Sequence, residues 1–388
     1  MTTRARIAIL LITAPILAFA VVGGLMGQTL PRQETYPHLR VFDDVFNITT
    51  GNYVEEVDAE RLMHGAMHGL AESLDADSAY LTPEQAKLAL AGTDPGPAEV
   101  GLDLTRQYYL RVVSARDGSP AAKAGLRPGD FVRVIGTTAT RELSVWEGMR
   151  LLRGAPGTTL SLTLIRGNAA EPHVIELTRE TPAPLPPVSK LLDGRIGYVR
   201  VPEFAAGTAA ALRAAAGQLQ KAGAHAIVID VRGTARGPIA TGIEAARLFV
   251  ASGTLILQDT RVATRQTIGA AAGDGTLTLP VALLTDFGTA GAAEVFVAAL
   301  SGTKRAETVG ERTSGHAAQQ KLFPLPDGSA MWMSYSWFLT PAGTPIHERG
   351  LQPDVAVAQP DTDFGGALPA GDATLDKAIE RLKPRIVS

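Results

Sequence analysis

The stretch that decides the fold reads Pro280-Val281-Ala282-Leu283-Leu284-Thr285-Asp286-Phe287-Gly288-Thr289-Ala290-Gly291-Ala292-Ala293-Glu294-Val295-Phe296. Residues 280–284 form an apolar run that predicts a buried strand, and a turn of small residues follows it. The turn leads into an Ala-rich helix whose first turn holds Glu294. Enzymes of the α/β class present a nucleophile on such a strand, turn and helix, because backbone N–H groups at a helix start can hold a developing oxyanion. The stretch therefore predicts an α/β core with a candidate reaction centre at the turn.

The segments before this stretch predict more of the same layer. Residues 226–231 are a near-continuous apolar run, which is typical of a strand buried in a parallel sheet. A second strand is expected over 195–201 and an Ala-rich helix over 209–222. Strands that alternate with helices indicate an α/β layer. The prolines between 182 and 187 predict a stiff linker in front of it.

Composition sets wide limits on the function. The chain has 388 residues, 45% of them hydrophobic and 19% charged, which is an ordinary globular balance with room for two or three domains. Its formal net charge of −3 gives no indication of nucleic-acid binding. The absence of cysteine excludes a disulfide framework and zinc thiolates.

The N-terminus indicates a compartment. Arg4 and Arg6 precede an uncharged, largely apolar run over 7–30, which is long enough to cross a bilayer as a helix. A positive flank stays in the cytoplasm, so we expect the remainder to be extracytoplasmic, on the periplasmic side. A cleavage site at Ala18-Phe19-Ala20 is the alternative, but the apolar run continues beyond it and favours an uncleaved signal anchor.

Residues 31–95 are expected to form a helical segment. Leu39, Phe42 and Val45 recur at helical spacing, and Asp58 is a candidate N-cap for a second helix. His64 and His68 stand four residues apart, a spacing that can place two metal ligands on one helix face. No third ligand is evident, so we expect these to be solvated or core histidines, and we expect neither a metal nor another cofactor.

A small mixed β domain is expected over residues 96–180. It contains the phrase Ser119-Pro120-Ala121-Ala122-Lys123-Ala124-Gly125-Leu126-Arg127-Pro128-Gly129-Asp130, followed by a helix over 144–152 and a strand over 159–166. This segment resembles a PDZ domain, in which a peptide C-terminus adds as a strand and backbone amides bind its carboxylate. The resemblance implies a groove lined by Gly101, Leu102, Asp103, Leu104, Val145 and Met149. The apolar members of this set could equally be ordinary core residues.

The remaining signal is the run Val309-Gly310-Glu311-Arg312-Thr313-Ser314-Gly315-His316-Ala317-Ala318-Gln319-Gln320. Together with residues 283–296 it resembles the carboxyl-terminal processing (tail-specific) peptidases of family S41. The phrase from Ser73 to Glu84 is similar to the same family, as is the segment Gly350-Leu351-Gln352-Pro353-Asp354. The resemblance thus covers most of the chain.

The resemblance implies a Ser and Lys catalytic pair, and this chain has neither side chain. The nucleophile position is Gly291, the base position is His316, and Gln320 stands where a residue orients the base. The amides of Gly237 and Ala292 stand where the family forms its oxyanion hole. The surrounding motif is intact, so a shifted alignment does not explain the two replacements.

A third departure lies after the strand over 226–231. Thr234-Ala235-Arg236 stands where the family has Asn-Pro-Gly, in the turn that supplies an oxyanion amide. A side chain at Arg236 is compatible with the turn, because only a position that requires a positive φ strictly needs glycine. Three departures in catalytic elements indicate relaxed selection on the chemistry.

The implied fold class is a multidomain α/β (α+β) protein. Its parts are a signal anchor (1–30), the helical segment (31–95), the PDZ domain (96–180) and a ClpP/crotonase-like S41 peptidase core with a C-terminal extension (181–388). A β-hairpin is expected over 319–325 and 330–336, and a last helix over 374–383.

The resulting hypothesis is a non-catalytic member of the family. It would bind the C-terminal tails of extracytoplasmic proteins or associate with an active paralogue or with itself. One alternative is an endopeptidase with a rearranged site, in which Thr289, Ser314 or a water molecule acts with His316, since imidazoles titrate near neutral pH. Another alternative is a structural scaffold in which even the PDZ groove is unused.

Overall fold

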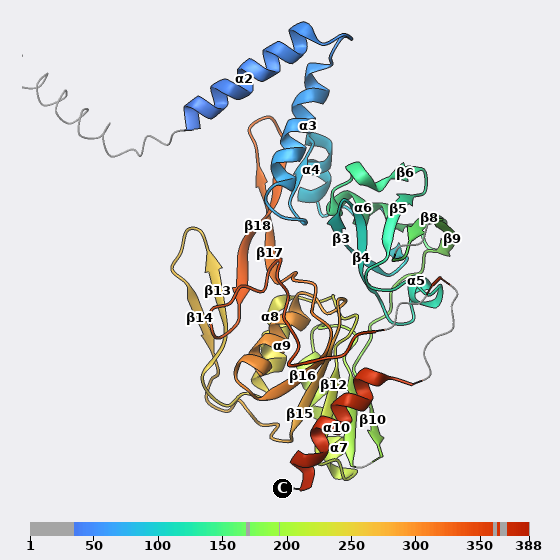
Figure 1. The fold of residues 1–388 in the computed structure, drawn as a ribbon, viewed down its shortest axis with the longest axis vertical. Coiled ribbons are helices and arrows are strands. Elements are labelled where there is room, and N and C mark those ends of the chain that lie inside the picture. Colours follow the sequence, from blue (N-terminus) through green and yellow to red (C-terminus); the bar gives the residue numbers. More distant parts are fainter. Residues whose placement is uncertain (1–34, 168–170, 194, 360–362, 365–370, 388) are drawn as a thin grey trace, which may run out of the picture. The chain divides into compact units, whose positions relative to one another are not determined.

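A six-stranded sheet carries the stretch that decides the fold (Figure 1). Its order is β10 (Val188–Leu192), β11 (Ile196–Arg200), β12 (Ala226–Asp230), β15 (Val281–Thr285), β16 (Ala306–Gly310) and β19 (Val355–Ala356). The first pair is antiparallel and the other four are parallel. All five residues of β12 and all five of β15 are buried, as their apolar runs predict.

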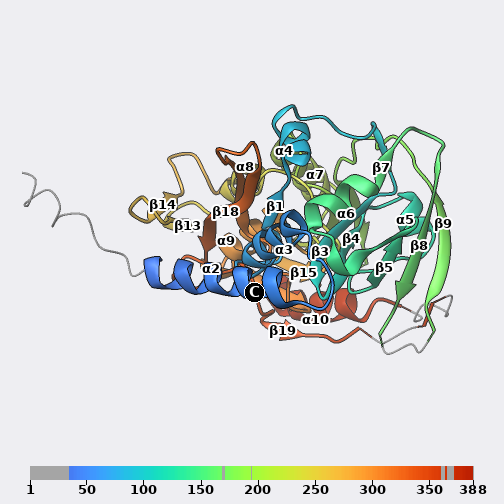
Figure 2. The ribbon, with the colours of Figure 1, turned by 90° about the horizontal axis from the view of Figure 1, so that it is seen from above.

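Helices cover both faces of this sheet. One core cluster joins its strands to α7 (Thr208–Lys221), α8 (Ile239–Arg247) and α9 (Ala292–Gly302). A second cluster, on the opposite face, joins them to α10 (Ala373–Val387), which Figure 2 shows with β19. Side chains alternate between the two faces of a strand, so β11, β12, β15 and β16 each contribute to both clusters. The sheet therefore holds the ends of β12 and β15 rigidly.

A second, antiparallel sheet packs against α8 and α9. Its order is β1 (Ala79–Leu81), β18 (Ala330–Leu339), β13 (Thr254–Thr260) and β14 (Gln266–Gly269), with β17 (Ala318–Pro324) paired to β18. Strands β17 and β18 form the expected hairpin. Strand β1 pairs with the start of β18, with Ala79 opposite Trp332. This pairing fixes the residues just before β1 close to the peptidase-like core.

The PDZ-like segment has its own sheet and core. The strands are β3 (Leu102–Gln107), β4 (Tyr109–Ala115), β5 (Phe131–Ile135), β6 (Thr138–Ala139), β8 (Thr159–Ile165) and β9 (His173–Thr178). Helices α5 (Pro120–Lys123) and α6 (Val145–Leu151), the 3-10 turn η1 (Thr140–Glu142) and the short pair β2 (Ala98–Glu99) with β7 (Arg153–Gly154) complete it. Ser119 and Ser144 cap the two helices, as Ser commonly does.

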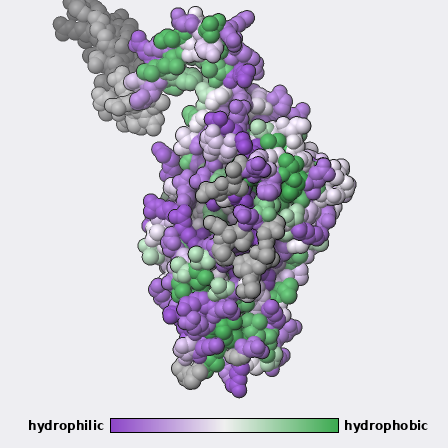
Figure 3. Space-filling view, turned by 45° about the vertical axis from the view of Figure 1, so that its right-hand side comes forward, coloured by the Kyte–Doolittle hydropathy of each residue, from purple (hydrophilic) through white to green (hydrophobic). Residues whose placement is uncertain are grey.

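The computed structural model describes residues 35–167, 171–193, 195–359, 363–364 and 371–387. The expected signal anchor at 1–30 lies outside these residues. None of the described helices is long and apolar enough to cross a membrane. On the face shown in Figure 3, hydrophilic and hydrophobic residues are interspersed, as on an ordinary globular surface.

The chain forms two compact units, Met1–Ala66 and Met67–Ser388. The first contains α2 (Thr35–Asn52) and the start of α3 (Ala59–Glu72), and α4 (Pro83–Leu90) belongs to the second. Asp58 caps α3 as expected, because its carboxylate accepts hydrogen bonds from the amides of Glu60 and Arg61 at 2.9 and 3.2 Å. The multidomain α/β fold class is confirmed, while the domain boundaries stay predictions.

Candidate active site

The turn between β15 and α9 places Gly291 at the N-cap of the helix. Its φ and ψ are 56° and −114°, a region that L-residues rarely adopt. A Cβ atom built there would lie 3.7 Å from the carbonyl oxygen of Ala235 and 3.9 Å from that of His316. These are ordinary contact distances. The position thus has room for a side chain, and only the backbone conformation opposes one.

Glu294 ties the nucleophile position to the base position. One of its carboxylate oxygens accepts the amide hydrogens of Gly291 (3.1 Å) and His316 (2.7 Å). The other accepts from the amide of Gly315 at 2.7 Å and from the hydroxyl of Thr313. The side chain is fully buried, and burial raises its pKa although the hydrogen-bond donors act to lower it. The carboxylate fixes residues 313–316 against the start of α9.

The turn that follows β12 is packed against the nucleophile turn. The amide of Ala290 donates to the carbonyl of Thr234 at 3.0 Å. Gly237 has a φ of 120°, and a Cβ there would lie 2.0 Å from the carbonyl oxygen of Phe204. Glycine is therefore required at 237. Arg236 is not among the described non-glycine residues with positive φ, in agreement with the interpretation that a side chain is tolerated there.

Two amides at this site are unpaired. Within the described part of the chain, neither the N–H of Gly237 nor that of Ala292 donates a hydrogen bond. Ala292 is buried, where a backbone amide is normally paired, whereas Gly237 is exposed and its amide can bond to water, so both amides can receive a ligand oxygen. These are the two amides expected for an oxyanion hole.

His316 occupies the base position, and its two ring nitrogens have different surroundings. Its Nε2 lies 3.8 Å from a carboxylate oxygen of Asp77, and its Nδ1 is buried without a hydrogen-bond partner among the described residues. The side chain is 18% exposed. Gln320, on β17, is half-buried, and its side-chain amide makes no hydrogen bond within the described residues.

The hydroxyls considered as substitute nucleophiles are both engaged. Thr289 is fully buried, and its hydroxyl donates to the carbonyl of Val231 at 2.9 Å and accepts from the amide of Asp286 at 3.1 Å. The Ser314 hydroxyl donates to the carbonyl of Thr289 at 3.1 Å. Both therefore stabilise the turns in which they lie.

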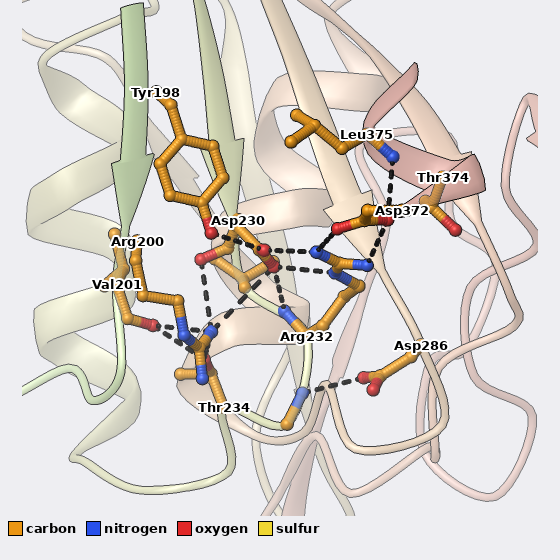
Figure 4. Close-up of polar contacts among 12 residues, drawn as sticks. Tyr198, Arg200, Val201, Asp230, Arg232, Thr234, Asp286, Asp372, Thr374 and Leu375 are labelled. Carbon is orange, nitrogen blue, oxygen red and sulfur yellow. Dashed lines mark hydrogen bonds and ion pairs between the residues drawn. The ribbon is translucent and has the colours of Figure 1, made fainter. Parts of the chain in front are cut away.

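A network of charged residues supports the β12 turn (Figure 4). Asp230 accepts from Tyr198 at 2.8 Å and from Arg232, whose guanidinium also contacts Asp372 at 2.7 Å. Asp286 accepts the amide of Gly233 at 2.8 Å. Burial raises the pKa of Asp286 to about 6. The turn is thus held by carboxylates at the end of β12, just after β15 and before α10.

The predicted groove residues lie together on the PDZ-like segment. Leu102 and Leu104 on β3 are buried, and Val145 and Met149 on α6 are half-buried against the same core cluster. Gly101 has a φ of 81°, and a Cβ there would lie 2.2 Å from the Cβ of Ser119. The loop before β3 accordingly requires glycine.

Arg236 connects this loop to the β12 turn. Its guanidinium pairs with Asp103 at 2.9 Å and with Glu99, and it donates to the carbonyl of Leu102 at 3.3 Å. Burial disfavours the charge, but the two carboxylates raise the pKa of Arg236 overall. A bidentate pair joins Arg200 to Asp117 at 2.9 Å. The sequence does not reveal these pairs, because their members are distant in the chain.

Asp75, Asp77 and His347 were also not identified from the sequence as site residues. Asp75 and Asp77 lie within the family-like phrase from Ser73 to Glu84, which was the available signal. Among the described residues, no group of three or more histidines or acidic residues is arranged to hold a metal ion.

Comparisons with known proteins agree with this architecture. The profile of Peptidase family S41 matches residues 195–357, and that of the PDZ domain matches residues 111–166. The chain is 31% identical to a carboxyl-terminal-processing protease of Synechocystis sp. over 78% of this chain and 72% of the relative. It is 30% identical to one of Bartonella bacilliformis, over 84% and 77%. The solved photosystem II D1 C-terminal processing protease superimposes with a TM-score of 0.69 at 28% identity, over 83% of this chain and 90% of that one.

Proposed function

This chain belongs to peptidase family S41, and on that premise we propose that it binds the C-terminal tails of extracytoplasmic proteins without cleaving them. The single observation that carries the proposal is Gly291, which stands at the nucleophile position although the motif around it is intact. A serine peptidase needs a hydroxyl that attacks the carbonyl and a base that takes its proton. Glycine offers no atom for the attack.

The substitute hydroxyls weigh against the alternative of a rearranged endopeptidase. Thr289 is fully buried with its hydroxyl donated to a carbonyl, so it would have to break that bond to attack a substrate. The Ser314 hydroxyl is likewise donated to a carbonyl. What remains after loss of a nucleophile in serine peptidases is roughly a 10³ to 10⁴-fold rate effect from binding and the oxyanion hole.

The predicted groove residues of the PDZ-like segment support tail binding. Leu102, Leu104, Val145 and Met149 bring apolar side chains from β3 and α6 to one core cluster, with a glycine loop beside them. Such grooves add a peptide as a strand and bind its carboxylate through backbone amides. The ligand class that fits is therefore an extended tail with a free carboxylate and an apolar last residue.

The alternative of a scaffold with an unused groove has one observation in its favour. Arg236 donates to the carbonyl of Leu102 in the loop that would receive the carboxylate. A carbonyl is not the group that binds a carboxylate, so this contact leaves the proposed role of the amides intact. Binding measurements separate the two functions directly.

The setting of this function is also part of the proposal. The apolar run over 7–30 with its positive flank supports a periplasmic-side location with an N-terminal membrane anchor. A protein that captures tails but cannot cut them would be useful beside an active paralogue, and we place association with one, or with a second copy, within the same proposal.

The experiment measures tail binding and cleavage by the full chain in detergent. A fluorescent peptide with an apolar last residue should bind and stay intact, and the same peptide with a C-terminal amide should bind about tenfold more weakly or worse, a loss of ~1.4 kcal/mol. Met149→Ala should weaken binding, while Met333→Ala, a half-buried methionine on β18, should not. Equal binding of the acid and the amide would contradict the proposal.

A further inference from the structure

Four buried or half-buried titratable groups from three segments gather at the base position. Asp75 and Asp77 lie in the loop before β1, His316 follows the motif at 313–315, and His347 lies in the loop after β18. Their side chains are between 3% and 18% exposed. His347 lies 3.5 Å from Asp75, and His316 lies 3.8 Å from Asp77. The loop with His347 is held there because the amide of Glu348 donates to the carbonyl of Gly315 at 2.8 Å.

Asp77 is held in place by the loop around it. One oxygen of Asp75 accepts the amide hydrogens of Asp77 (3.0 Å) and Ser78 (2.7 Å). The chain then enters β1, which is fixed by its pairing with β18. Burial acts to raise the pKa of Asp75, but its bonds with His347 and Ser78 lower it overall. Asp75 thus has a structural role, because its carboxylate holds the backbone of Asp77 in place.

The carboxyl of Asp77 faces the imidazole of His316. Burial raises the pKa of Asp77, and the nearby imidazole acts in the opposite direction. The separation of 3.8 Å is an ion-pair distance that is longer than a hydrogen bond. Catalytic contacts in unliganded sites are often long in this way and shorten when ligand binds.

The orientation of His316 leaves one ring nitrogen as a free base. When Nε2 faces a carboxylate, the proton resides on that nitrogen, and the lone pair is on Nδ1. Here Nδ1 is buried and has no hydrogen-bond partner among the described residues. The backbone of His316 is locked by Glu294, and its carbonyl oxygen lies 3.9 Å from a Cβ built at Gly291. An unpaired acceptor thus belongs to the residue that borders the vacant nucleophile position.

We propose that Asp77 and His316 form an acid–base pair that replaces the lysine of the family, so that this site lacks a nucleophile but not a base. The inference rests on the proposed function, because it takes Gly291 as the vacated nucleophile position. Once a hydroxyl is supplied at position 291, His316 is the group that takes its proton, and Asp77 is a positioning residue that acts through His316. Asp–imidazole pairs perform this task in unrelated serine peptidases.

The chemistry becomes complete when a hydroxyl is supplied at 291. In Gly291→Ser, Nδ1 of His316 takes the hydroxyl proton while the oxygen forms a bond to the carbonyl carbon of the substrate. The peptide C–N bond then breaks, and the departing amine takes that proton from the imidazole. Water hydrolyses the resulting ester by the same route and regenerates the serine. The amides of Gly237 and Ala292, which donate no hydrogen bond within the described residues, are available to the oxyanion.

The first test uses the full chain with Gly291→Ser, with and without Asp77→Asn. The single variant should cleave an apolar-tailed protein and react with a fluorophosphonate, increasingly so as pH rises through the range where imidazoles lose their proton. The groups that face His316 and contribute to this profile are Asp77, Asp75, His347 and Glu294. Asp77→Asn should lower the rate by about 10² or more, within the usual 10² to 10⁴ range of acid–base effects. Asp376→Asn, an exposed aspartate on α10, is the matched control and should leave the rate unchanged.

A second test does not depend on turnover. The chain contains no cysteine, so Gly291→Cys introduces a single thiol. Next to an imidazole and carboxylate pair a thiol ionises at lower pH than usual, and iodoacetamide should therefore alkylate it rapidly near pH 6 to 7, where an ordinary thiol with a pKa of about 8.5 reacts slowly. Asp77→Asn should abolish this reactivity at low pH.

The outcomes separate this inference from the function on which it rests. A folded Gly291→Ser chain that is inert, or one whose rate and thiol reactivity ignore Asp77→Asn, overturns the pair while leaving tail binding untouched. Variants at 291 that fail to fold contradict the finding that the position accepts a side chain. Cleavage by the unaltered chain would instead contradict the proposed loss of peptidase activity.

Discussion

Replacing Glu294 by glutamine should remove the connection between the nucleophile and base positions. Glutamine keeps the shape of the side chain but turns one oxygen into an NH₂ group. If that group takes the place of the oxygen facing Gly291 and His316, two amide donors meet a third donor. The bonds to Thr313 and Gly315 can remain on the amide oxygen.

The magnitude follows from the two bonds that are lost. Hydrogen bonds to a charged group contribute roughly 1.5–3 kcal/mol each, so their loss costs about 3–6 kcal/mol. The neutral amide is easier to bury than the carboxylate, whose pKa is raised by burial, and this offsets part of the cost. We expect a net decrease of about 2–4 kcal/mol in the free energy of unfolding.

The assay is urea unfolding of the full chain, followed by tryptophan fluorescence. Glu244→Gln, an exposed glutamate on α8, is the matched control and should change the free energy by no more than about 0.5 kcal/mol. A decrease below about 1 kcal/mol for Glu294→Gln would refute the reasoning, because it would mean that the four donors do not depend on the carboxylate charge.

Three further predictions concern the turn after β12. Burial raises the pKa of Asp286 from 3.8 to about 6, so the protonated carboxyl stabilises the fold at low pH and this contribution is lost as pH rises through that interval. Relative to Asp286→Asn, the free energy of unfolding of the native chain should therefore fall by about 3 kcal/mol between pH ~4 and ~6. Gly237→Ala should cost about 3 kcal/mol or more because its Cβ would lie 2.0 Å from the Phe204 carbonyl, whereas Gly207→Ala, with a φ of 90° and open space, should cost about 1 kcal/mol in the same assay. Removing the guanidinium in Arg236→Met leaves Asp103 without this cation and Glu99 with its longer contact to Arg153 at 3.7 Å, and should lower the free energy of unfolding by about 2–4 kcal/mol; a change below about 1 kcal/mol would show that the pairs are not formed.

Local patterns in the sequence were sufficient for much of the fold. The apolar runs at 226–231 and 280–284 became β12 and β15, and the Ala-rich run at 209–222 became α7, because periodicity and burial act over short distances. The hairpin of β17 and β18 followed from its turn residues. The pairing of β1 with β18 was not predicted, because a three-residue strand carries no pattern of its own.

The site divides in the same way. Gly291 and His316 could be located from the motif around them, and the structure brings Glu294 to both. The contact of His316 with Asp77 could not be predicted, since it depends on how the β1 loop folds over the base position. The contact of Arg236 with Asp103 in the PDZ-like segment could not be predicted either, because it too depends on tertiary packing. Side-chain pairs between distant segments are set by tertiary packing, which one sequence does not display.

The most direct test of the central claim is prolonged incubation of the full chain with an unfolded protein that ends in an apolar residue, with mass spectrometry of the products. The account predicts that the tail is bound and the protein remains intact, while a sample of Gly291→Ser cleaves it under the same conditions. Cleavage by the native chain that disappears in Thr289→Ala or in His316→Ala would contradict the account, because it would show that a working nucleophile exists outside position 291.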